Sequence, residues 1–436
     1  MIFENIKKNH ITIYLILFFL SLILGVAITE ILTLFFFIFF LNNKNKTLIN
    51  FNFDWFQKLF LILVVYICLN FIVNTILFDY KLDYIRSLLY GRFFILFLII
   101  SNFVNSKILN KVLKFWSIIL IFLCADLIFQ YIVGFNILGF ETIGGRVSSF
   151  FLDELKAGSF LTKFGIPICF YCYLVFKKKF GIKIFYIFAL YLFISIYLTG
   201  ERMALVTFFI TLFISFLIVK GFKKNIIIIL LPFVIFFFGL IKINENNRWN
   251  SHSLLEKREQ SFYELNGIKK INSFDEKIDK FYTILDSSGH LPLFFTSFNL
   301  WNERKIIGHG LKSFRELCDK KSSKIKFKYN TCSTHPHNYY FETLSELGLV
   351  GLLILISLFT VVIKDYFKIN KNHKFKNNEF DSIMLKALFA NFLGTILIIS
   401  SGSFFNNWIS YSFWINISLY YSIIYKYSYI KNKTHE

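Results

Sequence analysis

Long apolar runs alternate with short polar connections along most of the 436 residues. A helix needs about 20 apolar residues to cross a hydrocarbon core about 30 Å thick, so the pattern predicts an all-α membrane protein with about twelve transmembrane helices. The first two spans form one run that only Gly25 and Glu30 interrupt. The predicted spans are residues 11–27, 28–41, 59–78, 88–105, 112–134, 158–176, 183–199, 202–219, 225–241, 345–363, 383–402 and 406–425.

Basic residues give these helices a direction. Lys and Arg are concentrated in every second loop, which is typical of loops that face the cytoplasm. Both termini are then predicted to be cytoplasmic. No small-residue cleavage site follows the first run, so we do not expect a cleaved signal peptide.

One outer connection, residues 242–344, is much longer than the others. Loops beyond about 15 residues without structure of their own are uncommon unless they have a function. Its stretches FDEKIDKFYTIL and LPLFFTSFNLW space apolar residues as an amphipathic helix does, which predicts a helical cap on the membrane. The chain then divides into transmembrane helices 1 to 9 at residues 1–241, the outer loop at 242–344, and transmembrane helices 10 to 12 at 345–436.

The composition excludes other classes of protein. Hydrophobic residues make up 56% of the chain and charged residues 17%, which a soluble or disordered protein would not show. A net charge of +21 would indicate nucleic-acid binding in a soluble protein. Here the basic residues lie in short runs between apolar stretches, so membrane lipids are the predicted partners and nucleic acid is not.

The string CSTHPHNYYFETLSELGLVG leads into the tenth span. Ser333 or Thr334 can cap a helix and Pro336 suits a first turn, which places His335 and His337 at a helix N-terminus on the outer side. Such an end favours a phosphate or a developing negative charge. Two histidines two residues apart do not share a helix face, so no metal site is predicted. The alternative is a chance His-Pro-His at a helix start.

Two further strings carry charge to the same side. In GHGLKSFREL, Gly308 and Gly310 permit a tight turn whose amides could point at an anion, and Arg315 follows. In YLTGERMAL, Glu201 and Arg202 lie at the outer start of the eighth span. An arginine near a bilayer usually has a partner, so the alternative is a pair with Glu201 or with a lipid phosphate.

The predicted topology gathers arginines and histidines at one membrane surface. Arginine binds phosphate through a planar fork that stays charged at any relevant pH. The cluster therefore predicts a site for a doubly charged headgroup such as a lipid-linked diphosphate. Its members are Arg86, Arg92, Arg146, Arg202, Arg315, His290, His335 and His337.

Two of the six cysteines, Cys318 and Cys332, lie in polar sequence within the outer loop. The outside of a bacterial inner membrane is oxidising, so a disulfide between them is the favoured interpretation. Two free thiols are the alternative.

At these residues the sequence resembles the O-antigen ligase and polymerase superfamily of bacterial inner-membrane proteins. The resemblance covers residues 86–351 and rests on the twelve-span layout and on four strings: HPHN with FETLSELGLVG, GHGLKSFREL, GER, and RVSSFF with the DE and AGSFL that follow. Many members have Ser-Arg where this chain has Glu201-Arg202, so a role is carried over for Arg202 and none for Glu201.

The resemblance implies that a glycan on undecaprenyl diphosphate is transferred in the periplasm to an acceptor. Ligases use lipid A core sugars and polymerases use another repeat unit. No metal, nucleotide or other cofactor is expected. His337 would accept the proton of the acceptor hydroxyl and Arg202 would neutralise the leaving diphosphate. The predicted donor-binding residues are Arg146, Arg92, Arg86, Arg315, His335, His290, Asn338, Gly308 and Gly310.

The ligase is the preferred hypothesis and the polymerase is the alternative, because both share donor, compartment and motifs. A lipid-linked glycan transporter or a non-catalytic scaffold would be of another class. Transporters tend to show internal repeats and polar residues at the bilayer midplane. Here no repeat is evident, and only Asp126 and Lys386 lie deep in predicted spans.

Overall fold

The computed structural model describes residues 2–42, 53–78, 84–152, 154–222, 290–321, 332–371, 378–397 and 402–433. Within these ranges the protein is helical, with isolated β-bridges only between residues 135 and 146. The elements are α1 (Ile2–Leu24), α2 (Val26–Asn42), α3 (Trp55–Phe78), α4 (Tyr84–Leu89), α5 (Gly91–Phe103), α6 (Ser106–Val133), the 3-10 turn η1 (Ser149–Phe151), α7 (Ala157–Phe180), α8 (Lys183–Leu198), α9 (Arg202–Ile218), α13 (Leu291–Glu303), α14 (Phe314–Lys321), α15 (Tyr339–Lys371), α16 (Glu379–Leu397) and α17 (Asn407–Lys433).

Each predicted span within the described ranges falls on one helix, except that 11–27 and 88–105 each fall on two consecutive helices. Four helices are long and apolar enough to cross a membrane, namely α3, α6, α7 and α15, and five shorter helices are also apolar. These findings support an all-helical membrane protein. The ninth predicted span, 225–241, and the stretch FDEKIDKFYTIL lie outside the described residues, whereas LPLFFTSFNLW forms α13. The number of crossings, their direction and the outer location of residues 242–344 stay predictions.

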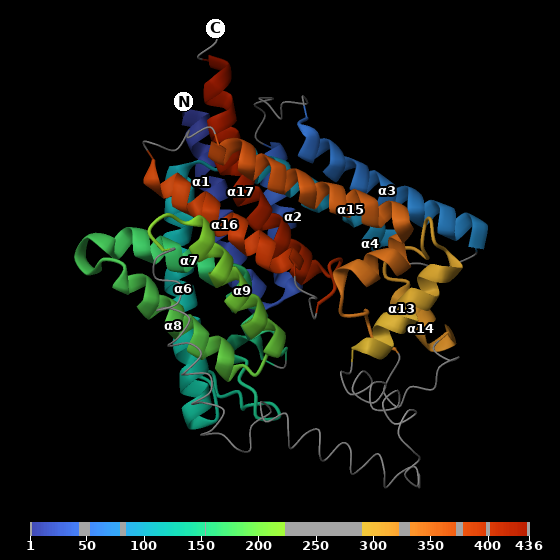
Figure 1. The fold of residues 1–436 in the computed structure, drawn as a ribbon, viewed down its shortest axis with the longest axis horizontal. Helices are drawn as coiled ribbons and strands as arrows, with labels where there is room; N and C mark the ends of the chain where they lie inside the picture. Colours follow the sequence, from blue (N-terminus) through green and yellow to red (C-terminus); the bar gives the residue numbers. More distant parts are fainter. Residues whose placement is uncertain are drawn as a thin grey trace.

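Helices from distant parts of the chain pack together (Figure 1). α17 contacts α5, α16 contacts α9, and α3 lies along α15. The start of α1 and the end of α17 lie at the same end of the molecule. Aromatic rings fill much of the core: the ring centroids of Trp414 and Phe60 are 3.9 Å apart and those of Trp116 and Phe19 are 4.8 Å apart. Such rings bury large apolar areas, so they join the two ends of the chain in one core.

A proline breaks the hydrogen-bond ladder of α7. Pro167 has no N–H and so cannot donate to the carbonyl of Lys163, four residues earlier. Two side chains donate to that carbonyl instead: the Nδ2 atoms of Asn391 in α16 and Asn416 in α17 lie 2.8 and 3.2 Å from it. Neighbouring helices must satisfy freed backbone groups where no water is present. The proline thereby ties three helices together.

This arrangement predicts a non-additive pair of substitutions. We expect Asn391→Ala to lower the free energy of unfolding by about 1 kcal/mol, because the Lys163 carbonyl loses its closer donor. In a Pro167→Ala background the same change should cost less, because the new N–H at residue 167 can donate to that carbonyl. Unfolding of the two single variants and the double variant in detergent measures the coupling. Equal costs of Asn391→Ala in both backgrounds would contradict this assignment.

A second break lies inside α15, at Gly348, where φ is 67°. The turn at residues 305–310 runs along this break and bonds to both of its sides. A Cβ at Gly348 would lie 2.2 Å from the Ile306 carbonyl oxygen, and one at Gly308 would lie 2.6 Å from that of Glu346. Only glycine therefore fits at either position. Four backbone bonds bridge the break: His309 N to Ser345 O at 3.0 Å, Gly310 N to Glu346 O at 2.7 Å, Leu349 N to Lys305 O at 2.8 Å, and Val350 N to Ile306 O at 3.2 Å.

Candidate functional site

Three predicted site histidines lie together, one just before α13 and two just before α15. The ring centroids of His335 and His337 are 4.1 Å apart, and those of His290 and His337 are 4.7 Å apart. Burial lowers the pKa of His290, and the neighbouring His337 lowers it further. A positive charge on His337 opposes protonation of His290, so the neutral form of the His290 ring is favoured. In the part of the chain that the structure describes, no three His, Cys, Asp or Glu side chains could hold a metal ion.

The backbone before α15 differs from the prediction. Its cap is Asn338, whose Oδ1 accepts hydrogen bonds from the backbone N–H groups of residues 340 and 341 at 2.9 and 3.1 Å. The predicted caps, Ser333 and Thr334, are wrong because the chain stays non-helical until Tyr339. His337 has a φ of +57°, a conformation that non-glycine residues adopt rarely and often at functional sites.

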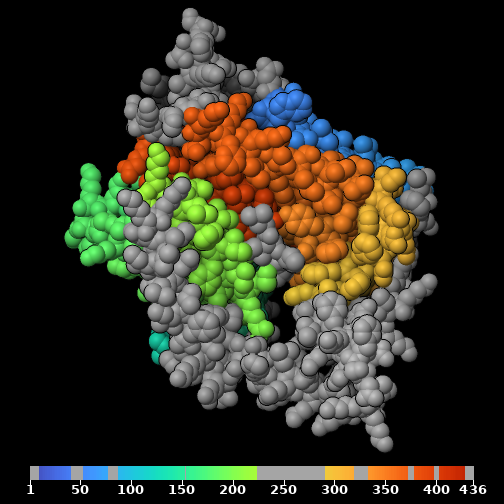
Figure 2. Space-filling view, viewed as in Figure 1, coloured from blue at the N-terminus to red at the C-terminus, as the bar shows by residue number. Residues whose placement is uncertain are grey.

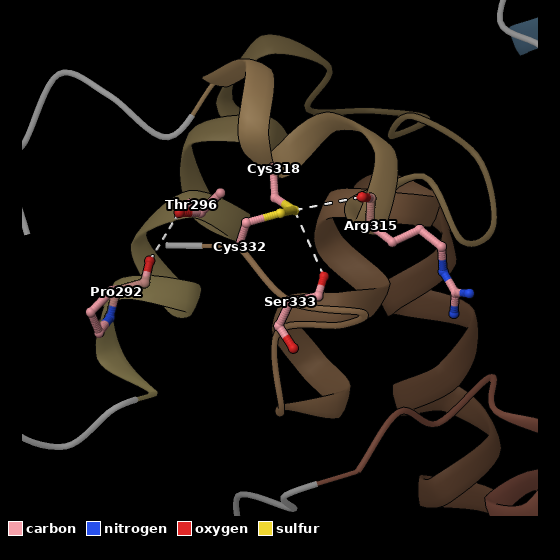
Figure 3. The surroundings of a disulfide bond; sticks show 6 residues. All are labelled: Pro292, Thr296, Arg315, Cys318, Cys332 and Ser333. Atoms are coloured by element: carbon pink, nitrogen blue, oxygen red, sulfur yellow. Dashed lines mark hydrogen bonds between the residues drawn. A yellow bond between two sulfur atoms is a disulfide. The ribbon is translucent and has the colours of Figure 1, made fainter. Parts of the chain in front are cut away.

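A disulfide holds the start of this segment (Figure 3). Cys318 of α14 is bonded to Cys332, with their Cα atoms 5.0 Å apart. The bond attaches the chain to α14 three residues before His335. Arg315, also on α14, is half-buried and its side chain extends away from the disulfide.

Charged side chains are buried where the GHGLK turn meets α15. Glu342 accepts hydrogen bonds from the hydroxyl of Ser403 and, at 2.7 Å, from the backbone N–H of Phe404. The Lys312 ammonium donates to the same Ser403 hydroxyl at 3.1 Å, and the Lys312 N–H donates to Glu346 Oε2 at 2.8 Å. These bonds join the GHGLK turn, α15 and the segment before α17. The sequence did not single out this cluster; its signal is the Glu pair, four residues apart, on the apolar face of FETLSEL.

The glycines of the GHG turn have a structural task here. The N–H of Gly308 donates to the carbonyl of Arg304 at 2.9 Å, and the N–H of Gly310 donates to that of Glu346 at 2.7 Å. Both amides are therefore engaged within the protein rather than turned toward an anion site.

A second cluster surrounds Glu201, which precedes α9. Its Oε1 accepts from the N–H of Gly158 at 2.7 Å and its Oε2 from the N–H of Ser159 at 3.0 Å, at the start of α7. Arg146 Nε donates to the Thr199 carbonyl at 3.0 Å. Burial raises the pKa of Glu201 to about 7, although the Gly158 N–H and the charge of Arg146 act in the opposite direction. The sequence analysis assigned Glu201 no role in the site. The signal that could have indicated one is its position between Gly200 and Arg202 at a predicted helix start.

The loop that carries Arg146 is folded back onto α6. Asp126 accepts hydrogen bonds from the N–H of Ile137 at 2.9 Å and from the hydroxyl of Ser149. Gln130 Oε1 accepts from the N–H groups of Ser148 and Ser149 at 3.0 and 2.7 Å. The deep aspartate noted in the sequence therefore shapes the loop that presents Arg146.

The other predicted arginines occupy different surroundings. Arg202 is the first residue of α9 and is exposed. Arg92 forms an ion pair with Glu30 at 2.7 Å, and the Tyr411 hydroxyl donates to the same carboxylate at 2.8 Å. This network joins α5 to α2 and α17. Arg86 lies in α4. Phosphate binding by any of these arginines stays a prediction.

The two clusters belong to different helices: Glu201 contacts the start of α7, and the histidines lie just before α13 and α15. Figure 2 shows the surface recessed between α9, which begins at Arg202, and α13, which follows His290. Fold and site define a helical membrane protein with imidazole and guanidinium groups at the starts of its helices.

Residues 187–356 match the family described as O-antigen ligase, which supports a relation to the O-antigen ligase superfamily. The predicted resemblance is confirmed. That family is enzymatic and glycosyltransferase-like, and the match supports a glycan-related function. No curated protein matches the chain. The matched segment includes Arg202, Arg315 and all three clustered histidines, whereas Arg146 and Arg92 precede it.

Proposed function

We propose that the protein transfers a glycan from undecaprenyl diphosphate to lipid A core sugars at the periplasmic face of a bacterial inner membrane. The observation that carries the proposal is the composition of the family-matched segment. It contains Arg202 at the start of α9 and the His290, His335 and His337 cluster at the start of α13 and α15. These groups can serve the two needs of the reaction, charge neutralisation and proton removal.

The chemistry assigns a task to each group. A hydroxyl oxygen of the acceptor forms a bond to the anomeric carbon while the bond from that carbon to the diphosphate breaks. His337 takes the hydroxyl proton, and the electron pair of the broken bond leaves on the diphosphate. Arg202 and Arg146 stabilise that developing charge. Attack from the face opposite the diphosphate inverts the anomeric configuration.

A repeat-unit polymerase is the second candidate, because the same family match and the same donor chemistry support it. Deletion of the gene, followed by a gel of surface polysaccharide and of lipid-linked glycan, separates the candidates. Lipid-linked chains of normal length that stay unattached indicate a lost ligase. Single repeat units indicate a lost polymerase. Lipid-linked glycan trapped on the cytoplasmic side would instead indicate a transporter and contradict both.

A further inference from the structure

We propose that Glu201 is a positioning residue that aligns Arg146 with the start of α7 for glycan transfer. The inference rests on the proposed function for its activity measurement. The contacts of Glu201 with α7 are independent of the proposed function, because the structure contains them.

The contacts around Glu201 form one unit from three parts of the chain. The carboxylate spans two successive N–H groups of α7, those of Gly158 and Ser159. Arg146 Nε donates to the carbonyl of Thr199, and the Arg146 Cγ lies 3.5 Å from where a Cβ of Gly200 would be. The arginine therefore crosses the TGE turn beside the carboxylate.

Close packing makes this unit specific. A Cβ at Gly158 would lie 2.5 Å from the Thr199 hydroxyl and 3.1 Å from Glu201 Oε1. Glycine at this position lets the TGE turn approach α7 closely enough for the carboxylate to reach its amides. A helix is usually capped by the residue just before it, whereas this carboxylate comes from more than 40 residues away. A distant acceptor placed beside an arginine does more than cap a helix, since it also fixes where the arginine lies.

The charges that face Glu201 come from each neighbouring element. Arg146 belongs to the loop after α6, Lys163 belongs to α7, and Arg202 is the next residue on α9. Lys156, at the start of α7, is paired with Glu154. Arg146 and Lys163 are the described cations that lower the pKa of this carboxyl, and its negative charge attracts both when it is ionised.

Protonation acts on alignment and stability with opposite signs. The pKa of Glu201 is raised from 4.5 to about 7, so the ionised form predominates above pH 7. As the pH falls through 7, the carboxyl loses its charge and one of its accepting oxygens, and Arg146 is less well aligned. A raised pKa also means that the folded protein binds the proton more tightly than the unfolded chain. The contribution of Glu201 to stability is therefore largest below pH 4.5 and is lost as the pH rises through 7.

The test compares Glu201→Gln with the wild type across pH. At pH 8 we expect the variant to transfer glycan about 10- to 100-fold more slowly, because a misplaced charge loses much of its effect. Its rate divided by the wild-type rate should rise toward one as the pH falls to 6. Over the same range, the thermal midpoint of the wild type should rise relative to that of the variant. A residue with only a structural role would lower activity and stability together, and that parallel loss would overturn the proposal.

Two further measurements complete the test. Glu141→Gln removes an exposed carboxylate from the Arg146 loop and should leave the pH profile unchanged; a change as large as that of Glu201→Gln would overturn the proposal. Hydrogen exchange at the amides of Gly158 and Ser159 should be faster in Glu201→Gln, whether or not glycan is transferred. If the wild type transfers no lipid-linked glycan, the proposed function fails, while unchanged exchange in the variant refutes the role of Glu201.

Discussion

Replacement of His337 is expected to reduce glycan transfer by about 100- to 10,000-fold, the usual contribution of a positioned general base. The imidazole lies at the centre of the histidine cluster, with neighbouring ring centroids at 4.1 and 4.7 Å. His337→Asn is the sharper variant, because asparagine tolerates the left-handed conformation that His337 adopts at φ +57°. It removes the base without adding backbone strain. Transfer of lipid-linked glycan to acceptor, measured with purified protein, gives the rate.

Two controls separate chemistry from folding. His10→Ala removes an exposed imidazole from α1 and should leave transfer unchanged. His337→Ala should unfold more readily than His337→Asn, because alanine tolerates a positive φ less well. Full activity in the asparagine variant would show that the imidazole does not act as the base.

Gly348→Ala is expected to lower the free energy of unfolding by about 2–5 kcal/mol, from left-handed strain and overpacking together. The added methyl would meet the backbone of Ile306, which cannot rotate away as a side chain can. Because the turn at 305–310 and α15 are bonded across this break, the histidine segment should loosen as well. Denaturant unfolding in detergent measures the effect.

Gly144→Ala is the matched control. Gly144 also has a positive φ, of +56°, but nothing lies within 4 Å of its Cβ position. Its cost should be limited to backbone strain of about 1–2 kcal/mol. If both variants lost equal stability, the close approach at Gly348 would not be the cause.

The sequence predicted where the helices lie, but it did not predict where some of them are broken. The span at 88–105 is divided in the structure into α4 and α5, and the break in α15 falls at Gly348. The cap of α15 was placed too early, because Ser333 and Thr334 are equally good caps by residue type and Asn338 follows them closely. Local propensity does not distinguish these positions; the disulfide and the histidine packing do.

The candidate site shows the same division. The predicted topology placed His290, His335 and His337 at one membrane surface. The structure places their three rings together. The engagement of Arg92 with Glu30 was not predicted, nor was the role of Glu201 at α7. Charge and residue type predict what a side chain can bind, but a partner within the protein competes for it.

By itself, the sequence indicated the membrane class, the positions of the helices and the family resemblance, since apolar runs and short motifs are local properties of the chain. The tertiary structure decided which groups meet: Asn391 at the carbonyl freed by Pro167, Glu201 at Gly158, and the GHG turn at the break in α15. These partners are far apart in sequence. Their contacts depend on how helix faces pack, and hydrophobic periodicity does not specify which faces meet.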